Sequence, residues 1–163
     1  MEALMVDRLP MAGQMRNCAT LYTRIGAFLQ TYAGPILSLA IRLWIASVFF
    51  KSGLQKLDDW DSTVYLFEYE YMVPILSPAL AAAVATAFEL MMPVLLTVGL
   101  LTRLSALPLL GMALVIQFIL GASNPAYDNV EHFYWMFLLG FLIVYGPGRI
   151  SIDSVVRRMF VTR

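Results

Sequence analysis

A small set of polar side chains interrupts otherwise apolar stretches of this sequence, and these residues are the candidates for chemistry. They comprise three cations, one carboxylate, two amides and one imidazole: Arg42, Lys51, Gln55, Lys56, Glu89, Gln117 and His132. A charged side chain at the middle of a bilayer costs at least about 2.5 kcal/mol, so each needs a partner, water or a route to the interface. The set predicts either an intramembrane polar site or hydrogen bonds that only hold helices together.

Glu89 is the natural counter-charge for one of these cations. Arg42 and Lys51 are nine residues apart, which places them on opposite sides of a helix. At about 1.5 Å per residue, Lys51 is expected about 9 Å and Glu89 about 13–14 Å below the outer surface. A lysine side chain covers that difference, which favours a Lys51–Glu89 pair. The alternatives are an Arg42–Glu89 pair, or an Arg42 that extends to the cytoplasmic surface.

The remaining candidates map to the outer half of the predicted bundle, with Glu89 as its floor. Gln117 lies one turn inside the end of a predicted helix, and His132 opens the next helix beside Glu131. We therefore expect a site, open to the outer face or the outer leaflet, that takes a polar-headed small molecule such as a quinone. His132 suits a proton carrier or a quinone hydrogen-bond donor, because imidazole titrates near neutral pH. An interfacial or capping role is its alternative.

The composition indicates an integral membrane protein. The chain of 163 residues is 60% hydrophobic and 13% charged, whereas soluble domains are about 45–50% apolar and about 25% charged. Its formal net charge is zero, so no nucleic-acid partner is expected. Cys18 and His132 are the only residues of their kinds, which excludes an intrachain disulfide, a CxxC pair and a multi-histidine haem or metal site within this chain. We therefore expect no metal.

Four apolar stretches predict an all-α, four-helix membrane bundle. They lie at about 36–57, 80–101, 104–120 and 130–145. The first has about 22 residues and a length of roughly 33 Å, enough for a hydrocarbon core of about 30 Å, whereas the fourth reaches only about 24 Å. The bundle is expected to occupy 34–148, between a juxtamembrane segment at 1–33 and a basic tail at 149–163.

The segments outside these stretches carry weaker signals. Residues 58–78, acidic and aromatic, are expected to form the longest link outside the membrane. In 1–33, a helical spacing of apolar residues predicts a short amphipathic helix on the membrane surface, with a partly ordered tail as the alternative: Leu21, Ile25, Phe28 and Tyr32. Pro35 suits the start of the first span.

The distribution of positive charge predicts the orientation. Arginines gather in the N-terminal segment, the 101–104 link and the tail: Arg8, Arg16, Arg24, Arg103, Arg149, Arg157, Arg158 and Arg163. The two other loops are acidic, with Lys56 at the edge of one of them. Because cytoplasmic loops are enriched in Lys and Arg, both termini are expected in the cytoplasm. Cys18 is then in a reducing compartment.

Three sequence patterns resemble the DoxX family of small bacterial membrane proteins. They are RLWIASVFFKSGLQKL at 42–57, FELMMPVLLTVGLLTRL at 88–104 and GPGRISID at 146–153, within a resemblance that covers about 37–157. The resemblance implies a four-helix, multi-pass protein of the bacterial inner (plasma) membrane. It also implies family-type positions, with no catalytic role attached: Gly53, Lys56, Glu89, Gly99 and Arg103.

The resemblance implies function only broadly. The family takes its name from a subunit of a thiosulfate:quinone oxidoreductase, and other members resemble membrane partners in redox or metal-stress systems. The first hypothesis is a membrane subunit or accessory of a quinone-linked redox or stress-response system; enzymatic activity would then belong to the complex, because this chain has no complete catalytic site. The alternatives are a non-enzymatic anchor or scaffold for a partner protein, and a small transporter or channel. The bilayer is the expected partner in each case, with a partner protein or a homo-oligomer beside it.

Overall fold

The computed structural model describes residues 9–161, and the side chains of residues 18–160. Its elements are all helical, with no strand in the described range. Arg8, Arg163 and the side chain of Arg16 therefore lie outside the described part of the chain.

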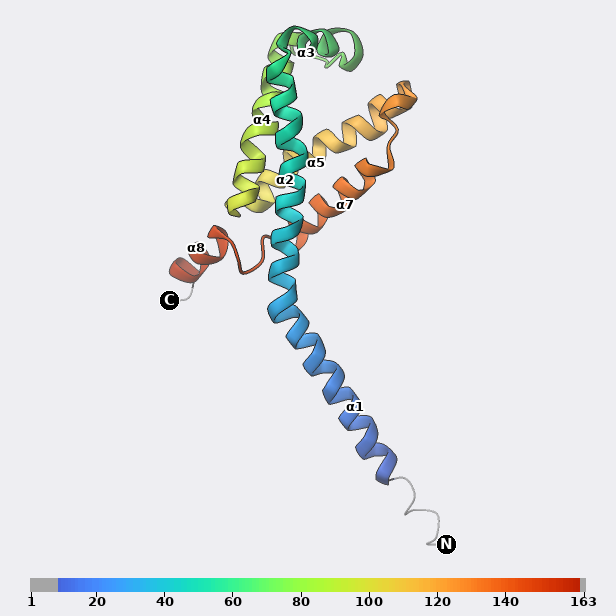
Figure 1. Cartoon of the computed structure of the whole chain (residues 1–163), viewed down its shortest axis with the longest axis vertical. Helices are drawn as coiled ribbons and strands as arrows, with labels where there is room; N and C mark the ends of the chain where they lie inside the picture. Colours follow the sequence, from blue (N-terminus) through green and yellow to red (C-terminus); the bar gives the residue numbers. More distant parts are fainter. Residues whose placement is uncertain (1–8, 162–163) are drawn as a thin grey trace.

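One long helix forms the first third of the structure. It consists of α1 (Leu9–Phe28), the π-helical turn η1 (Leu29–Ala33) and α2 (Gly34–Asp58), which follow one another without a break (Figure 1). Pro35 lies in the first turn of α2, near the helix start predicted there, but α2 continues from the π turn without a break. The wider turn accommodates the proline, which lacks an N–H and crowds the preceding turn.

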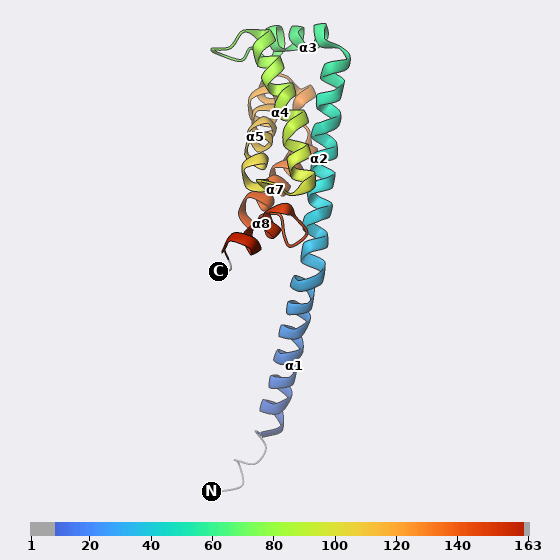
Figure 2. The ribbon, with the colours of Figure 1, turned by 90° about the vertical axis from the view of Figure 1, so that its left-hand side faces the viewer.

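α1 extends away from the bundle roughly along the direction of α2 (Figures 1 and 2). The position of this helix on the membrane surface stays a prediction. Leu21, Ile25 and Phe28 of α1 and Tyr32 of η1 are all at least half exposed.

A short helical cap forms most of the link expected at 58–78. It consists of α3 (Trp60–Leu66) and the π turn η2 (Phe67–Tyr71), and it lies across the end of α2 (Figure 1). The side chain of Asp59 begins α3 by accepting a hydrogen bond from Ser62 N at 3.0 Å. Hydrogen bonds from Ser62 also lower the pKa of Asp59.

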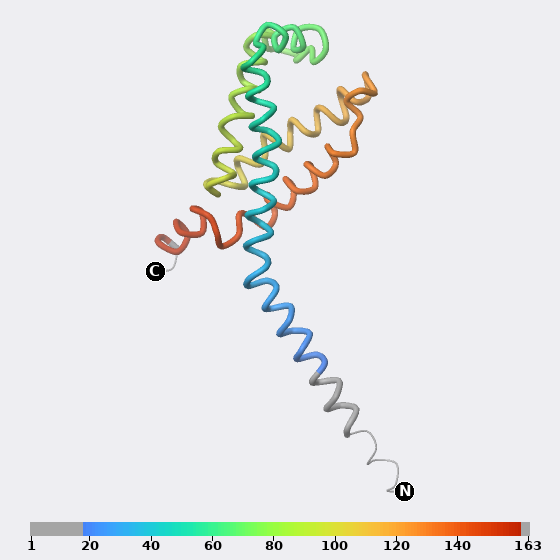
Figure 3. Tube along the Cα trace, in the orientation of Figure 1, coloured from blue at the N-terminus to red at the C-terminus, as the bar shows by residue number. Residues whose placement is uncertain are grey.

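The remaining helices complete two antiparallel pairs. They are α4 (Pro78–Val98), α5 (Thr102–Leu114) with η3 (Val115–Leu120) and α6 (Gly121–Ser123), the 3₁₀ turn η4 (Pro125–Tyr127), α7 (Val130–Tyr145) and α8 (Ile152–Val161). α2 packs against α4, α5 packs against α7, and α4 joins the two pairs by contacting α5. Figure 3 shows the α5–α7 pair crossing the α2–α4 pair obliquely. The tail predicted at 149–163 contains α8, which the sequence analysis missed.

The core lies where these helices cross. Its buried side chains combine large residues with alanines: Ile45, Phe49, Leu96, Leu109, Leu139 and Leu142, with Ala46, Ala106 and Ala113. Helices occupy all four stretches predicted as spans. Within the described residues, Cys18–Asp58, Pro78–Val98 and Thr102–Ser123 are long and apolar enough to cross a membrane, and Val130–Tyr145 is a shorter apolar helix.

Gly53 allows α2 to approach α4 closely. A Cβ added there would lie 2.9 Å from Leu90 Cδ2 and 3.1 Å from Glu89 Cβ. Glycine at such a contact is typical of tightly packed membrane helices. The contact sets Gly53 level with Glu89, and this register determines which cation the carboxylate meets.

Candidate functional site

Glu89 pairs with Lys56. The Lys56 Nζ lies 2.6 Å from Glu89 Oε2 and donates a second hydrogen bond to Ser52 Oγ at 2.9 Å. The Glu89 side chain is only 6% exposed and that of Lys56 is 18% exposed. The predicted Lys51–Glu89 and Arg42–Glu89 pairs are therefore wrong. Lys56 follows Gly53 by three residues on the same face of α2, so the close approach at Gly53 points Lys56 toward Glu89.

Arg42 is at the other end of the bundle and is fully buried. Its guanidinium donates to Leu96 O at 3.2 Å, to Thr97 O at 3.4 Å and to Ile150 O. The first two carbonyls belong to the last turn of α4, where a cation interacts favourably with the helix dipole. Arg42 thus joins α2, α4 and the segment before α8, which is a structural role.

Lys51 and Gln55 lie on the exposed face of α2. Within the described part of the chain, neither side chain has a hydrogen-bond or ion-pair partner. Gln55 lines a small recess between α2 and α3, on the outside of the bundle. These two residues therefore do not join Glu89.

Gln117 and His132 form a second, separate polar cluster. His132 Nδ1 lies 2.9 Å from Gln117 Oε1, and Gln117 Nε2 donates to Asp128 Oδ1 at 2.6 Å. Both Gln117 and His132 are buried, and the imidazole packs edge-on against Trp135. Glu131 is exposed, and its backbone N–H is capped by the Asn129 side chain. The cluster joins η3 to the start of α7, as interhelical hydrogen bonds do in membrane bundles.

An apolar cavity of about 310 Å³ opens beside the Lys56–Glu89 pair. This volume is at the lower end of the range for small-molecule sites. The walls come from the α3–η2 cap, from α4 and from α5 with η3: Phe67, Tyr71, Val73, Leu76, Ala81, Val84, Ala85, Phe88, Gly111, Met112, Val115, Ile116 and Leu120. The cavity is thus an apolar pocket with one ion pair at its polar end, and we call it the Glu89 pocket.

Tyr71 connects the mouth of the Glu89 pocket to the loop after α6. Its ring meets that of Tyr127 edge-on, with centroids 6.1 Å apart, and the Tyr127 hydroxyl donates to the carboxylate of Glu70. Burial raises the pKa of Tyr71, and the hydrogen bond to Glu70 raises the pKa of Tyr127. Both phenols are therefore neutral at physiological pH. The sequence predicts Tyr71 only as part of a link, and its contact with Tyr127 at the pocket was not expected. The run of aromatic and acidic residues at 65–71 is the feature of the sequence that could have indicated it.

Two hydrogen-bonding positions at the Glu89 pocket have no partner among the residues that the structure describes. The Lys56 ammonium has three N–H groups, and the structure gives partners for two of them. Glu89 accepts through Oε2, and Oε1 has no partner among the described residues. One donor and one acceptor beside an apolar cavity fit the oxygen of a quinone or a quinol. No group of three His, Cys, Asp or Glu side chains that could hold a metal ion occurs in the described range.

Comparison with known proteins supports the resemblance noted above. The family model described as DoxX matches residues 37–122, which include Lys56, Glu89 and most of the pocket walls. A Haemophilus influenzae protein, described as an uncharacterized protein, is 31% identical over 134 residues. The alignment covers 77% of this chain and 86% of the relative. No solved structure matches the chain significantly.

Proposed function

The chain belongs to the DoxX family of membrane proteins, and from this premise we propose that it binds a quinone in the Glu89 pocket as the membrane subunit of a redox system. The observation that carries the proposal is the buried Lys56–Glu89 pair at one end of an apolar cavity. A buried ion pair costs desolvation energy and is often no better for stability than apolar packing. Its position beside a cavity therefore favours a role in binding.

The residues of the pocket suit the chemistry of a quinone. Apolar walls accept the ring and the start of an isoprenoid tail, and the opening lets the tail continue into the bilayer. The free N–H of Lys56 can donate to a ring carbonyl, and Oε1 of Glu89 can accept from the hydroxyl of the reduced form. A bound quinone would supply the capacity to take up electrons. This chain would bind and orient the quinone and exchange a proton with it. Electrons would come from a partner protein, because the chain has one cysteine and one histidine.

The proposed placement in the membrane follows the charge pattern. We infer that α2, α4, α5 with α6, and α7 all cross a bacterial inner membrane, with both termini in the cytoplasm. The α3–η2 cap and the Glu89 pocket then lie toward the outer leaflet. α7 is the shortest of the four, and packing against α5 supports it within the bundle.

Binding of a short-chain ubiquinone analogue to the detergent-purified protein tests the proposal. Lys56→Met and Glu89→Gln are expected to weaken binding about tenfold or more, since a charge-assisted hydrogen bond contributes about 1.5–3 kcal/mol. Lys51→Met is the matched control, because it removes a lysine from the exposed face of the same helix, and it should bind like the wild type. Thermal unfolding of each variant separates lost binding from lost folding. No binding by the wild type, or an equal loss in Lys51→Met, would contradict the proposal.

A second candidate function is the anchoring of a partner protein at the membrane. The specific observation is α1, which extends beyond the bundle with exposed apolar side chains that include Leu21 and Phe28 (Figure 2). Affinity purification of a Leu21→Glu/Phe28→Glu variant from cross-linked cells tests it. Loss of one specific partner, with quinone binding unchanged, would favour anchoring; an unchanged set of partners would contradict it.

A further inference from the structure

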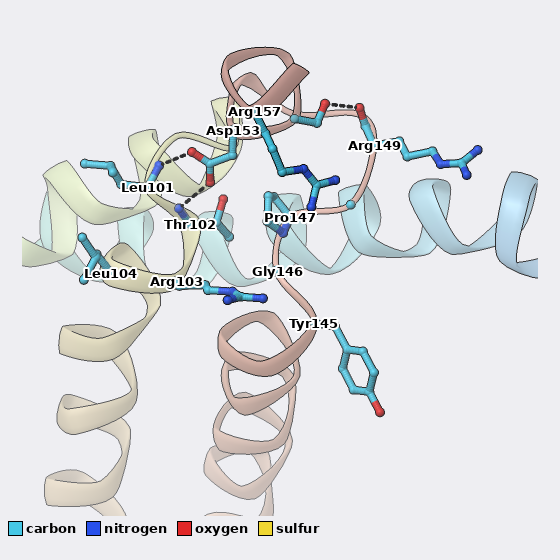
Figure 4. A pocket seen from close by; sticks show the side chains of 12 residues that line it. Leu101, Thr102, Arg103, Leu104, Tyr145, Gly146, Pro147, Arg149, Asp153 and Arg157 are labelled. Carbon is cyan, nitrogen blue, oxygen red and sulfur yellow. Dashed lines mark hydrogen bonds between the residues drawn. The ribbon is translucent and has the colours of Figure 1, made fainter. Parts of the chain in front are cut away.

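A basic pocket lies at the end of the bundle opposite the Glu89 pocket. It has a volume of about 440 Å³ and is formed where the turn into α5, the end of α7 and the start of α8 meet. Three arginines from three different elements line it: Arg103, Arg149 and Arg157 (Figure 4). We propose that this pocket binds the phosphate of an anionic phospholipid at the cytoplasmic surface of the membrane.

The positive charge of the pocket is not neutralised within the protein. Asp153 is the single carboxylate in the lining, and both of its oxygens are occupied. They accept from Leu101 N at 2.8 Å and from Thr102 N at 3.0 Å, which caps the start of α5. In the described range the guanidinium groups of Arg149 and Arg157 have no hydrogen-bond or ion-pair partner. Three arginines against one aspartate leave the pocket positively charged.

The geometry brings two of the arginines toward one point. Arg103 donates to Val144 O at 3.1 Å, which holds its side chain beside Gly146. Gly146 has a φ of +78°, and a Cβ there would lie 3.5 Å from Arg103 Nε. Figure 4 shows Arg157 pointing from α8 toward the same Gly146–Pro147 turn, while Arg149 points outward. Two guanidinium groups that line one pocket suit a phosphate, whose oxygens accept paired N–H bonds.

The surroundings favour a lipid as the source of that phosphate. α8 is amphipathic, and its apolar residues are exposed: Ile152, Val155, Val156, Met159 and Phe160. Figure 1 shows α8 turned away from the axis of α2, as expected for a helix at a membrane surface. Leu101 and Leu104 are also more than half exposed and line the pocket itself, where acyl chains can pack. Basic pockets of this kind between membrane helices bind anionic headgroups.

The test measures which lipid the full chain retains from a defined mixture. The purified protein is exchanged into nanodiscs of equimolar phosphatidylcholine and phosphatidylglycerol, extracted gently, and its bound lipids are counted by native mass spectrometry. The wild type should retain phosphatidylglycerol in preference. Arg157→Gln, whose side chain has no partner to lose, should reduce this preference several-fold, and Arg103→Gln/Arg157→Gln should reduce it about tenfold or more.

Two controls make the result decisive. Arg24→Gln removes the same charge from the exposed surface of α1 and should leave the preference unchanged. Inorganic phosphate, added at a concentration equal to the lipid, should not displace phosphatidylglycerol. An equal loss in Arg24→Gln would show a general charge effect and overturn the proposal. Displacement by inorganic phosphate would assign the pocket to a soluble ligand and overturn the lipid source.

Discussion

Replacement of Gly53 by alanine tests the helix contact on which the Glu89 pocket depends. The new Cβ would lie 2.9 Å from Leu90 Cδ2, 3.0 Å from Leu90 Cγ and 3.1 Å from Glu89 Cβ. Carbon atoms pack at about 3.5–4.0 Å, so α2 and α4 must separate by roughly 0.5 Å. Such overpacking costs about 1–3 kcal/mol, and the better helix propensity of alanine returns about 1 kcal/mol. We expect Gly53→Ala to lower the free energy of unfolding by up to about 2 kcal/mol.

Gly140→Ala is the matched control. Gly140 is also a helical glycine, but a Cβ there would meet nothing within 4 Å. Alanine at this position should therefore be neutral or stabilising by up to about 1 kcal/mol. Unfolding in mixed micelles by titration with dodecyl sulfate, followed by tryptophan fluorescence, measures both changes. If Gly53→Ala is as stable as Gly140→Ala, the close α2–α4 contact and the register derived from it are wrong.

Three further substitutions test the structural roles of other polar residues in the same unfolding assay. Arg42→Met removes the guanidinium donor from three backbone carbonyls, of which Leu96 O still accepts from Gly99 N, and should cost about 1–3 kcal/mol. Arg149→Met should change stability by less than about 0.5 kcal/mol, and similar losses in the two variants would refute the buried role of Arg42. Asp153→Ala removes the cap of α5 and should lower the free energy of unfolding by about 1–2 kcal/mol. It should also speed proteolysis before α8, whereas Asp61→Ala in α3 should have neither effect. Gln117→Leu removes the partner of His132 Nδ1 and should cost about 1–3 kcal/mol; an unchanged stability would show that this cluster does not hold α7.

The apolar stretches predicted the main helices because length and composition dominate in a membrane protein. The helical cap and α8 were missed because each is short and its start depends on single hydrogen bonds. The Asp59 side chain caps α3, and a backbone hydrogen bond from Asp153 N to Gly99 O supports the start of α8. Pro35 is in the first turn of α2, as the preference of proline for helix starts indicated, but the sequence did not reveal the π turn that joins α2 to α1.

The candidate site shows what helix depth alone cannot predict. Glu89 was expected to be buried and paired with a cation. In the structure Glu89 is buried and paired, but its partner is Lys56 rather than Lys51 or Arg42. The sequence gives a depth along each helix and not the offset between two helices, which here depends on the contact at Gly53. Neither alternative for Arg42, a pair with Glu89 or an extension to the cytoplasmic surface, included its actual partners, because these are backbone carbonyls, which no residue type reveals.

The central claim, that a quinone occupies the Glu89 pocket, is tested most directly by photo-crosslinking. A quinone analogue with a photoreactive tail is bound to the purified protein, illuminated, and its adducts are mapped by mass spectrometry. We predict adducts within residues 67–73 and 111–120, suppressed by excess unlabelled quinone and reduced in Glu89→Gln. Adducts spread over the exposed faces of α1 and α2, unchanged by competition or by Glu89→Gln, would contradict the claim.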